Sequence, residues 1–445
     1  MDDYRALADR VAAEIGSGRL RPGDRLPPQR RFARGYGIAN STAARVYREL
    51  VRRGLVVGEV GRGTFVRSAG PAPEPALAEP GAARVDLELT ISVLPEQSAL
   101  LGKGLGRMLR PDVLDAALRP VGAAGTTAAR EATAAALARP GWVPAPPDVL
   151  FAGNGRQAIA AALAALVPPG ARLAVESLTY PVTRALATRL GCALVPVETD
   201  ESGLVPEALA RAHHAAPLRA VYLQPTLHNP LGCTMPPARR AALAEVLREH
   251  GIHAIEDRVY AFLGDTQPPL ASLAPEHTVV VDSLSKRLAP GLTLGFLVSP
   301  SGIVERIATA LRSGALTASG FALDAATGWL TDGTVATMER AKRVDAAARQ
   351  GLVAEKLAGF AVRSGQNSYH CWWELPRPWR AETFVGAVAR RGIAVTPAAA
   401  FAVGAGQAPN AVRLALSAPP LPTLAGALEV LATLARGVPD DSGPE

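Results

Sequence analysis

The sequence predicts two folded parts, an N-terminal winged helix-turn-helix and a larger α/β domain built on a largely parallel sheet. Three observations predict this division. Residues 1–67 hold 14 arginines and 7 acids, so they carry all of the chain's net charge of +7. A Pro/Ala-rich stretch at residues 68–83 has the composition of a semi-stiff linker. Beyond it, over residues 84–437, helical patterns alternate with short β-branched or apolar runs.

The pattern of the first domain predicts three helices followed by a hairpin. Residues 2–16 place apolar side chains at helical spacing, and residues 17–27 form a predicted loop rich in glycine and proline. Helical patterns at 28–37 and 41–54 precede two predicted strands with a glycine-rich turn at 55–67. In a winged helix-turn-helix with this order, the second helix of the motif can place its first residues against base edges in the major groove.

The charge of this domain favours double-stranded DNA as the partner. The rest of the chain holds 33 basic and 33 acidic residues, so it is neutral. A basic surface attracts the phosphate backbone. The alternatives are a basic surface that is merely solvated and a three-helix scaffold that no longer touches DNA.

Six runs in the larger domain predict the strands of one sheet, at residues 172–177, 193–198, 220–225, 252–257, 278–283 and 294–299. Polar residues lie at the ends of four of them, at 176–180, 224–229, 257–260 and 283–286. Because ligands bind at the carboxyl ends of parallel strands, we expect these residues to share a site.

Lys286 is the most informative residue of these sets. It is one of only four lysines, with Lys103, Lys342 and Lys356, whereas 43 of the basic residues are arginine. Arginine cannot form a Schiff base, but a desolvated lysine with a lowered pKa attacks an aldehyde readily. Pyridoxal 5'-phosphate (PLP) is the cofactor that requires such a lysine.

The chain supplies a candidate for each further requirement of PLP. Asp257 can pair with the pyridinium nitrogen, Asn229 and Tyr260 can donate to the phenolic oxygen, and Tyr180 can stack on the ring. Residues 152–163 place a glycine turn at a helix start, where free N–H groups bind phosphate. Taken singly, Asp257 could be a helix N-cap and Tyr180 a core aromatic residue.

The first domain resembles the GntR family of bacterial regulators. The resemblance lies in "LPPQRRFARGYGIANSTAARVYRELVRRGLVVGEVGRGTFV", where the helix pair and the "GRGTFV" wing follow the family's order. It implies contacts to DNA from Arg30, Ser41, Thr42, Arg45, Arg62, Gly63 and Thr64. This chain has Ala39-Asn40 where the family usually has Ser-Arg. Because Asn40 can read adenine, we expect an altered operator preference.

The larger domain resembles the fold-type I, class I/II aminotransferases in "GNGRQA", "VESLTYP", "HNPLG", "IEDRVY", "SLSK" and "AVRLALS". The resemblance implies a large, mostly parallel mixed sheet with a smaller α+β subdomain. It implies that Lys286 carries the cofactor and that Arg413 clamps a substrate carboxylate. The other implied cofactor contacts are Asp257, Tyr260, Asn229, Tyr180, Ser283 and the backbone of Gly155 and Arg156.

A GntR domain, a linker and an aminotransferase-like domain form the layout of the MocR-type regulators. This resemblance implies a homodimer that binds an operator and uses PLP with an amino compound as its signal. In this hypothesis the amino ligand displaces Lys286 from the cofactor, and domain closure alters operator binding. The alternatives are an active aminotransferase that carries a DNA-binding module and a domain without PLP that only dimerises.

Two positions depart from the aminotransferase pattern. Thr293 stands where an arginine commonly grips the phosphate, and Pro120 lies near the position of a tyrosine lent to the neighbouring subunit. The loss of one charged hydrogen bond costs roughly 1.5–3 kcal/mol. Our hypothesis is that Arg156, where the family usually has a small residue, replaces the missing charge. The alternative for Arg156 is a solvated helix arginine.

Several classes of protein do not fit the sequence. Cysteines 192, 233 and 371 and the seven histidines lack the spacing of metal ligands. No run of 18 apolar residues predicts a membrane span, and the acidic start of the chain is not a signal peptide. We therefore expect a cytoplasmic protein without a metal site.

Overall fold

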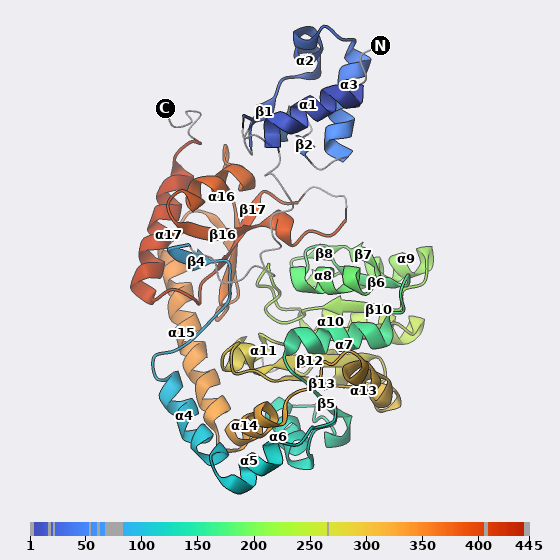
Figure 1. Cartoon of the computed structure of the whole chain (residues 1–445), viewed down its shortest axis with the longest axis vertical. Coiled ribbons are helices and arrows are strands. Elements are labelled where there is room, and N and C mark those ends of the chain that lie inside the picture. The colour runs from blue at the N-terminus through green and yellow to red at the C-terminus, as the bar shows by residue number, and fades with distance from the viewer. Residues whose placement is uncertain are drawn as a thin grey trace.

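The computed structural model describes residues 4–16, 19–20, 23–52, 55–59, 63–66, 83–264, 267–404 and 408–439. Apart from Ala83, the predicted linker at 68–83 lies outside these ranges. Figure 1 shows the N-terminal helices at one end of the molecule, beside the smaller subdomain of the C-terminal part. At this contact the guanidinium carbon of Arg380 lies 4.1 Å from the ring centre of Phe65.

The N-terminal part has the predicted winged helix-turn-helix order, with helices α1 (Tyr4–Gly16), α2 (Gln29–Tyr36) and α3 (Asn40–Arg52) before strands β2 (Val56–Glu59) and β3 (Gly63–Val66). Phe32, Val46 and Leu50 are buried in its core. One element differs from the prediction, because residues 25–26 of the predicted loop form strand β1 (Arg25–Leu26), antiparallel to β3. Two residues among glycines and prolines carry no readable alternation, so only the pairing partner reveals this strand.

The large sheet has the strand order β5-β13-β12-β11-β10-β6-β7. The strands are β5 (Val149–Ala152), β6 (Arg172–Glu176), β7 (Ala193–Val197), β10 (Ala220–Leu223), β11 (His253–Asp257), β12 (Thr278–Ser283) and β13 (Gly295–Val298). The strands from β7 to β12 in this order run parallel, which confirms the predicted fold class.

The predicted strand at 294–299 is present but runs in the opposite direction to the parallel set. It forms β13, which pairs antiparallel with both β12 and β5. Only residues 284–294 connect β12 to β13, whereas a parallel crossover needs about a dozen residues or more. The short connection therefore reverses the chain.

Helices cover both faces of the large sheet, because consecutive strand residues alternate between two apolar clusters. Tyr222 packs with residues of α7 (Gly155–Leu166), α8 (Pro181–Arg189) and α13 (Val304–Ser313). Its neighbours Val221 and Leu223 pack with α9 (Pro206–Ala215) and α10 (Pro237–His250). A sheet buried in this way opens to ligands only at its ends.

The remaining elements complete the large domain and the smaller subdomain. Those of the large domain are α4 (Gln97–Met108), α5 (Pro111–Ala117), α6 (Thr127–Leu137), β8 (Thr199–Asp200), β9 (Gly203–Leu204), α11 (Ala261–Gly264), α12 (Leu284–Arg287) and α14 (Gly320–Thr331). The long helix α15 (Thr334–Lys356) leads to the smaller subdomain, whose helices are α16 (Ala381–Ala389) and α17 (Leu421–Arg436).

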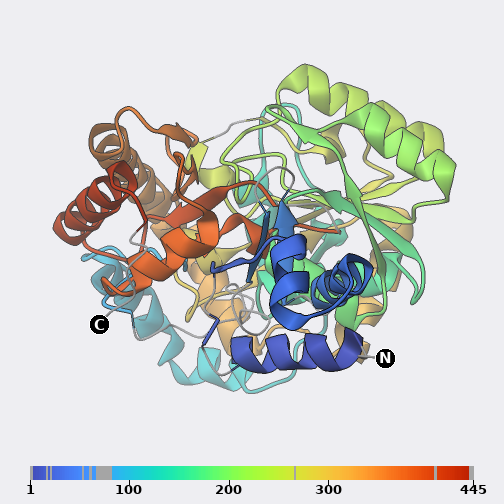
Figure 2. The ribbon, with the colours of Figure 1, turned by 90° about the horizontal axis from the view of Figure 1, so that it is seen from above.

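The smaller subdomain has a five-stranded sheet in the order β14-β15-β17-β16-β4. Its strands are β4 (Val85–Leu87), β14 (Ala361–Arg363), β15 (His370–Glu374), β16 (Ile393–Pro397) and β17 (Ala411–Ala415). Strand β4 lies far from the others in sequence and pairs parallel with β16. Figure 2 shows from above how the N-terminal helices sit over the rest of the chain.

Candidate functional site

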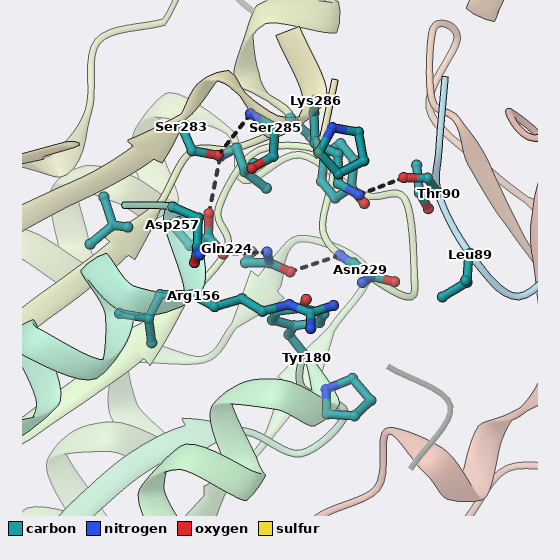
Figure 3. Close-up of a pocket in the computed structure, with 18 of the residues that line it drawn as sticks. Leu89, Thr90, Arg156, Tyr180, Gln224, Asn229, Asp257, Ser283, Ser285 and Lys286 are labelled. Carbon is teal, nitrogen blue, oxygen red and sulfur yellow. Dashed lines mark hydrogen bonds between the residues drawn. The ribbon is translucent and has the colours of Figure 1, made fainter. Parts of the chain in front are cut away.

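A pocket of about 340 Å³ lies at the carboxyl ends of the parallel strands and reaches the smaller subdomain. It is lined by all nine residues that the sequence predicted for the larger domain, namely Gly155, Arg156, Tyr180, Asn229, Asp257, Tyr260, Ser283, Lys286 and Arg413. Figure 3 shows the side chains of Lys286, Asp257, Asn229, Tyr180 and Arg156 gathered around this cavity. The sheet topology thus brings together residues up to 258 positions apart in the chain.

Lys286 lies in the one-turn helix α12, directly after β12. Its Nζ donates a hydrogen bond to the main-chain oxygen of Thr90 at 2.5 Å. Burial, and then the positive charges of Arg156 and Arg413, lower the pKa of Lys286 to about 8, against the opposing effect of Asp257. A larger fraction of this amine is therefore neutral at physiological pH than for an exposed lysine.

Asp257 is the last residue of β11 and is fixed by three donors. Oδ2 accepts from the Tyr222 hydroxyl and from Gln224 Nε2, both at 2.8 Å, and Oδ1 accepts from the Val259 N–H at 3.0 Å. Burial raises the pKa of Asp257 to about 6, although these hydrogen bonds favour the charged form. A nearby cation, such as a protonated ring nitrogen, would stabilise the carboxylate.

The N-terminus of α7 and the end of β12 meet at one corner of the pocket. The Asn154 side chain caps α7 by accepting from the Gln157 N–H at 3.0 Å. Gly155 is the first residue of the helix, and a Cβ placed on it would lie 3.0 Å from Ser283 Oγ. Glycine keeps the space between this helix start and the serine hydroxyl open, as an anion cradle requires.

Arg156 and Tyr180 lie on the opposite side of the same pocket. The Arg156 guanidinium forms a hydrogen bond with the Tyr180 hydroxyl. Figure 3 shows this guanidinium beside the tyrosine ring and within the cavity. Thr293, at the position of the missing arginine, lines the pocket and pairs with the Ser285 hydroxyl at 2.6 Å. Pro120 is exposed and does not line the pocket.

Asn229 and Tyr260 present polar groups from neighbouring loops. Asn229 Oδ1 is buried and has no hydrogen-bond partner among the described residues, while its main-chain N–H donates to Gln224 Oε1 at 3.3 Å. Burial raises the pKa of the Tyr260 hydroxyl to about 12. Both residues can therefore serve as uncharged hydrogen-bonding groups.

Arg413 enters the pocket from β17 of the smaller subdomain. Its Nη2 donates to the main-chain oxygen of Glu88 at 2.6 Å and to Thr396 Oγ1 at 3.0 Å. Its Nε is buried with no hydrogen-bond partner in the described part of the chain. Because a guanidinium binds carboxylates through two parallel N–H groups, Arg413 suits an acidic ligand.

The donor set of the pocket fits PLP. A lysine of lowered pKa, a buried carboxylate, a helix start opened by Gly155 and the side-chain amide of Asn229 lie around one cavity. These are the groups that an aldehyde, a ring nitrogen, a phosphate and a phenolic oxygen require.

The predicted DNA contacts lie on the surface of the first domain. Arg30, Asn40, Ser41 and Arg45 are exposed, whereas Thr42, Gly63 and Thr64 are half-buried. Arg62 lies outside the described residues. Arg30 lies at the start of α2, and Asn40, Ser41 and Arg45 lie in the first turns of α3. Helix α3 is the one that would enter a groove of DNA.

Several groups that hold the site in place carry no signal in the sequence. Tyr222 donates its hydroxyl hydrogen bond to Asp257 from within strand β10. In the sequence, an aromatic residue in an apolar strand indicates only a core residue. In the sequence, Gln224 is only one member of the polar run at residues 224–229. Glu88 and Thr90 act through main-chain oxygens, which leave no trace in the sequence.

Two family models match separate parts of the chain. Residues 3–66 match the bacterial regulatory proteins of the gntR family, and residues 121–431 match aminotransferase class I and II. The fold and the site thus define a DNA-binding regulator whose second domain has an aminotransferase fold. The chain belongs to the MocR-type subfamily of GntR transcriptional regulators.

The curated relatives agree with this assignment. The HTH-type transcriptional regulator YdeF of Bacillus subtilis is 30% identical over 376 residues, which cover 84% of this chain and 81% of that protein. The vitamin B6 salvage pathway transcriptional repressor PtsJ of Salmonella typhimurium is 28% identical over 85% of this chain and 87% of its own length.

A solved structure confirms the fold of the larger part. An archaeal alanine:glyoxylate aminotransferase superimposes with a TM-score of 0.73 and 22% identity, over 80% of this chain and 91% of that chain. Within the described residues, no helix has the length and apolar character needed to cross a membrane.

Proposed function

We propose that this regulator binds PLP through Lys286 and senses an amino acid or related amino compound in the same pocket. The observation that carries the proposal is the convergence of Lys286, Asp257 and Arg413 on one cavity. PLP, when bound, supplies an aldehyde for amines and a ring that withdraws electrons. The side chains of the pocket bind and orient the cofactor and its ligand, and they gain or lose protons beside it.

Each group has a distinct task in this proposal. Lys286 offers a partly neutral amine, because burial and two arginines oppose its charge. Asp257, held by Tyr222 and Gln224, places a carboxylate where a ring nitrogen can be kept protonated. The start of α7 and Ser283 hold the phosphate, Tyr180 packs on the ring, and Asn229 and Tyr260 bind the phenolic oxygen.

Arg413 favours a ligand with a carboxylate. Its Nη2 group donates to the Glu88 main-chain oxygen, so a ligand carboxylate in this place would compete for the same donor. Such competition gives the ligand different affinities for two arrangements of residues 88–92. A difference of this kind is what a ligand needs in order to shift a conformational equilibrium.

The proposed DNA-binding surface is the first turns of α3 together with Arg30 and the wing. Arg45 and Asn40 are exposed there, as contacts to base edges require. We further propose that the protein acts as a homodimer in the cytoplasm. Large apolar side chains on and beside α4 and α5, Leu109 at 80% and Leu118 at 75% exposure, support a protein–protein contact on that face.

Absorption spectroscopy with added PLP tests the cofactor part of the proposal. The wild type is expected to develop a visible band that Lys286→Ala lacks. Adding amino acids singly should then shift the band with those that bind. Repeated conversion of the amino acid to its oxo acid, in the presence of a second oxo acid that takes up the amino group, would instead favour a working aminotransferase.

A further inference from the structure

Lys342, another of the four lysines, is buried in α15 and does not line the cofactor pocket. Its Nζ donates to the main-chain oxygens of Ser92 and Lys286, both at 2.9 Å, and to that of Leu288. An ammonium group has three N–H donors, and here each has a carbonyl acceptor. One buried amine thus joins Ser92 to the turn at residues 286–288, which lies 194 or more residues further along the chain.

The carbonyls of Lys286 and Leu288 need an outside donor. Helix α12 has four residues, so its last carbonyls have no following turn of helix to bond. Lys342 bonds to both of these oxygens, and Gln97 Nε2 adds a second bond to the oxygen of Leu288 at 3.2 Å. The backbone from which the Lys286 side chain starts is therefore held in part by α15.

The third acceptor belongs to the segment that faces the pocket. Residues 88–92 receive hydrogen bonds from Arg413 at Glu88, from Lys286 at Thr90 and from Lys342 at Ser92. Two of these donors are the proposed ligand-binding cations, and Lys342 is the one outside the pocket. The segment also follows β4, the first strand after the predicted linker.

The surroundings of Lys342 fit an amine that is kept for its hydrogen bonds, with three N–H donors when protonated and two when neutral. Burial, followed by the charge of Lys286, lowers its pKa to about 7, and Asp345 opposes this. A buried cation is costly unless hydrogen bonds replace its hydration, which the three carbonyls do. Core packing alone would be served better by an apolar side chain of the same length.

We propose that Lys342 is a positioning residue, which fixes the turn carrying Lys286 to residues 88–92 and so sets the position of the Lys286 amine. The inference rests on the proposed function only where PLP binding is measured, and the labelling of Lys286 does not depend on it. Without the Lys342 amine, the turn that carries Lys286 and residues 88–92 lose the hydrogen bonds that join them. The Lys286 amine should then become more mobile and hold PLP less well.

The test compares the full-length Lys342→Met variant with the wild type and with Lys356→Met, a control at a lysine whose charge pairs at the surface. Formaldehyde with cyanoborohydride labels Lys286 without PLP, and peptide mass spectrometry gives the labelling rate. We expect labelling to be at least about threefold faster in Lys342→Met, and PLP affinity to fall about tenfold. The visible circular dichroism of bound PLP should weaken as well.

Lys342→Arg keeps a buried cation with several donors and should restore most of the PLP affinity and the dichroism, which a requirement for packing alone would not predict. If Lys342→Met does not fold, Lys342→Gln takes its place in the same comparison. A folded variant with wild-type labelling, affinity and dichroism would overturn the inference. A wild type that gains no band with PLP would refute the proposed function instead, and the labelling rates alone would then decide the role of Lys342.

Discussion

The pocket of the larger domain and the surface of the winged helix use positive charge in opposite ways. In the pocket, Lys286 and Arg413 are held by main-chain oxygens at 2.5 and 2.6 Å, and burial lowers the pKa of both. On the winged helix, Arg30 and Arg45 are exposed. A pocket that binds one small ligand needs fixed, desolvated charges, whereas a surface that follows a polyanion keeps its charges solvated.

This difference determines which conditions each region responds to. Exposed charges are screened by salt, so binding to DNA should weaken steeply as the salt concentration rises. Buried charges are screened less and titrate at altered pH, so the pocket should respond mainly to pH and to single substitutions.

The largest expected effect is the pH dependence of the Lys286 amine. Only the neutral amine attacks an aldehyde, and the lowered pKa of about 8 means that its neutral fraction rises until pH 8 and then levels. Between pH 6 and 8 the rate of attachment of PLP should rise about fiftyfold. Stopped-flow absorbance at the visible band measures it. A rate that keeps rising towards pH 10.5 would show that burial and the arginines do not act on this lysine.

Arg413→Leu should produce the next largest effect, confined to the amino ligand. The loss of a bidentate, charge-assisted contact should weaken amino acid binding about thirtyfold, while PLP still gives its visible band. Titration of the band with an amino acid that shifts it in the wild type gives the affinity. Equal weakening for the matching amine without a carboxylate would contradict the role of Arg413.

Arg156→Ala tests whether this arginine replaces the missing phosphate partner. If it does, PLP affinity should fall about tenfold, because one charged hydrogen bond is lost. Pyridoxal without the phosphate should bind equally to both proteins, which separates phosphate binding from the contact with Tyr180. Unchanged affinity for PLP would show that Arg156 serves the tyrosine alone.

Arg30→Ala should have the smallest effect, confined to DNA. The affinity for a duplex should fall a few-fold, and the slope of log affinity against log salt should decrease by about one, because one phosphate contact is lost. Fluorescence anisotropy between 50 and 200 mM salt, with the promoter region of the gene itself as the duplex, is suitable for both values. An unchanged slope would remove Arg30 from the DNA surface.

The sequence predicted the pocket well because strand ends carry side chains with recognisable chemistry. Asp257, Ser283 and Lys286 follow buried apolar runs, and the parallel topology brings those ends to one edge. The direction of β13 was less visible, since it depends on the length of a connection and not on residue type. Strand β1 was hidden for the same reason, because its two residues matter only through their partner β3.

What the sequence could not reveal is how main-chain atoms complete the site. The oxygens of Glu88, Thr90 and Ser92 accept from three cations, yet any residue at these positions carries the same oxygen. The count of lysines includes Lys342 as one of four, but its acceptors became visible only with the fold. The same limit applies to Arg156, whose position in the chain did not disclose its contact with Tyr180.

The most direct test of the account is the visible absorption spectrum of the purified protein with added PLP, recorded beside Lys286→Ala and repeated with single amino acids. The account predicts a band in the wild type alone, and a shift of that band with those amino acids that also change the affinity for DNA. No band at saturating PLP would contradict it, and the larger domain would then retain the aminotransferase fold without its cofactor.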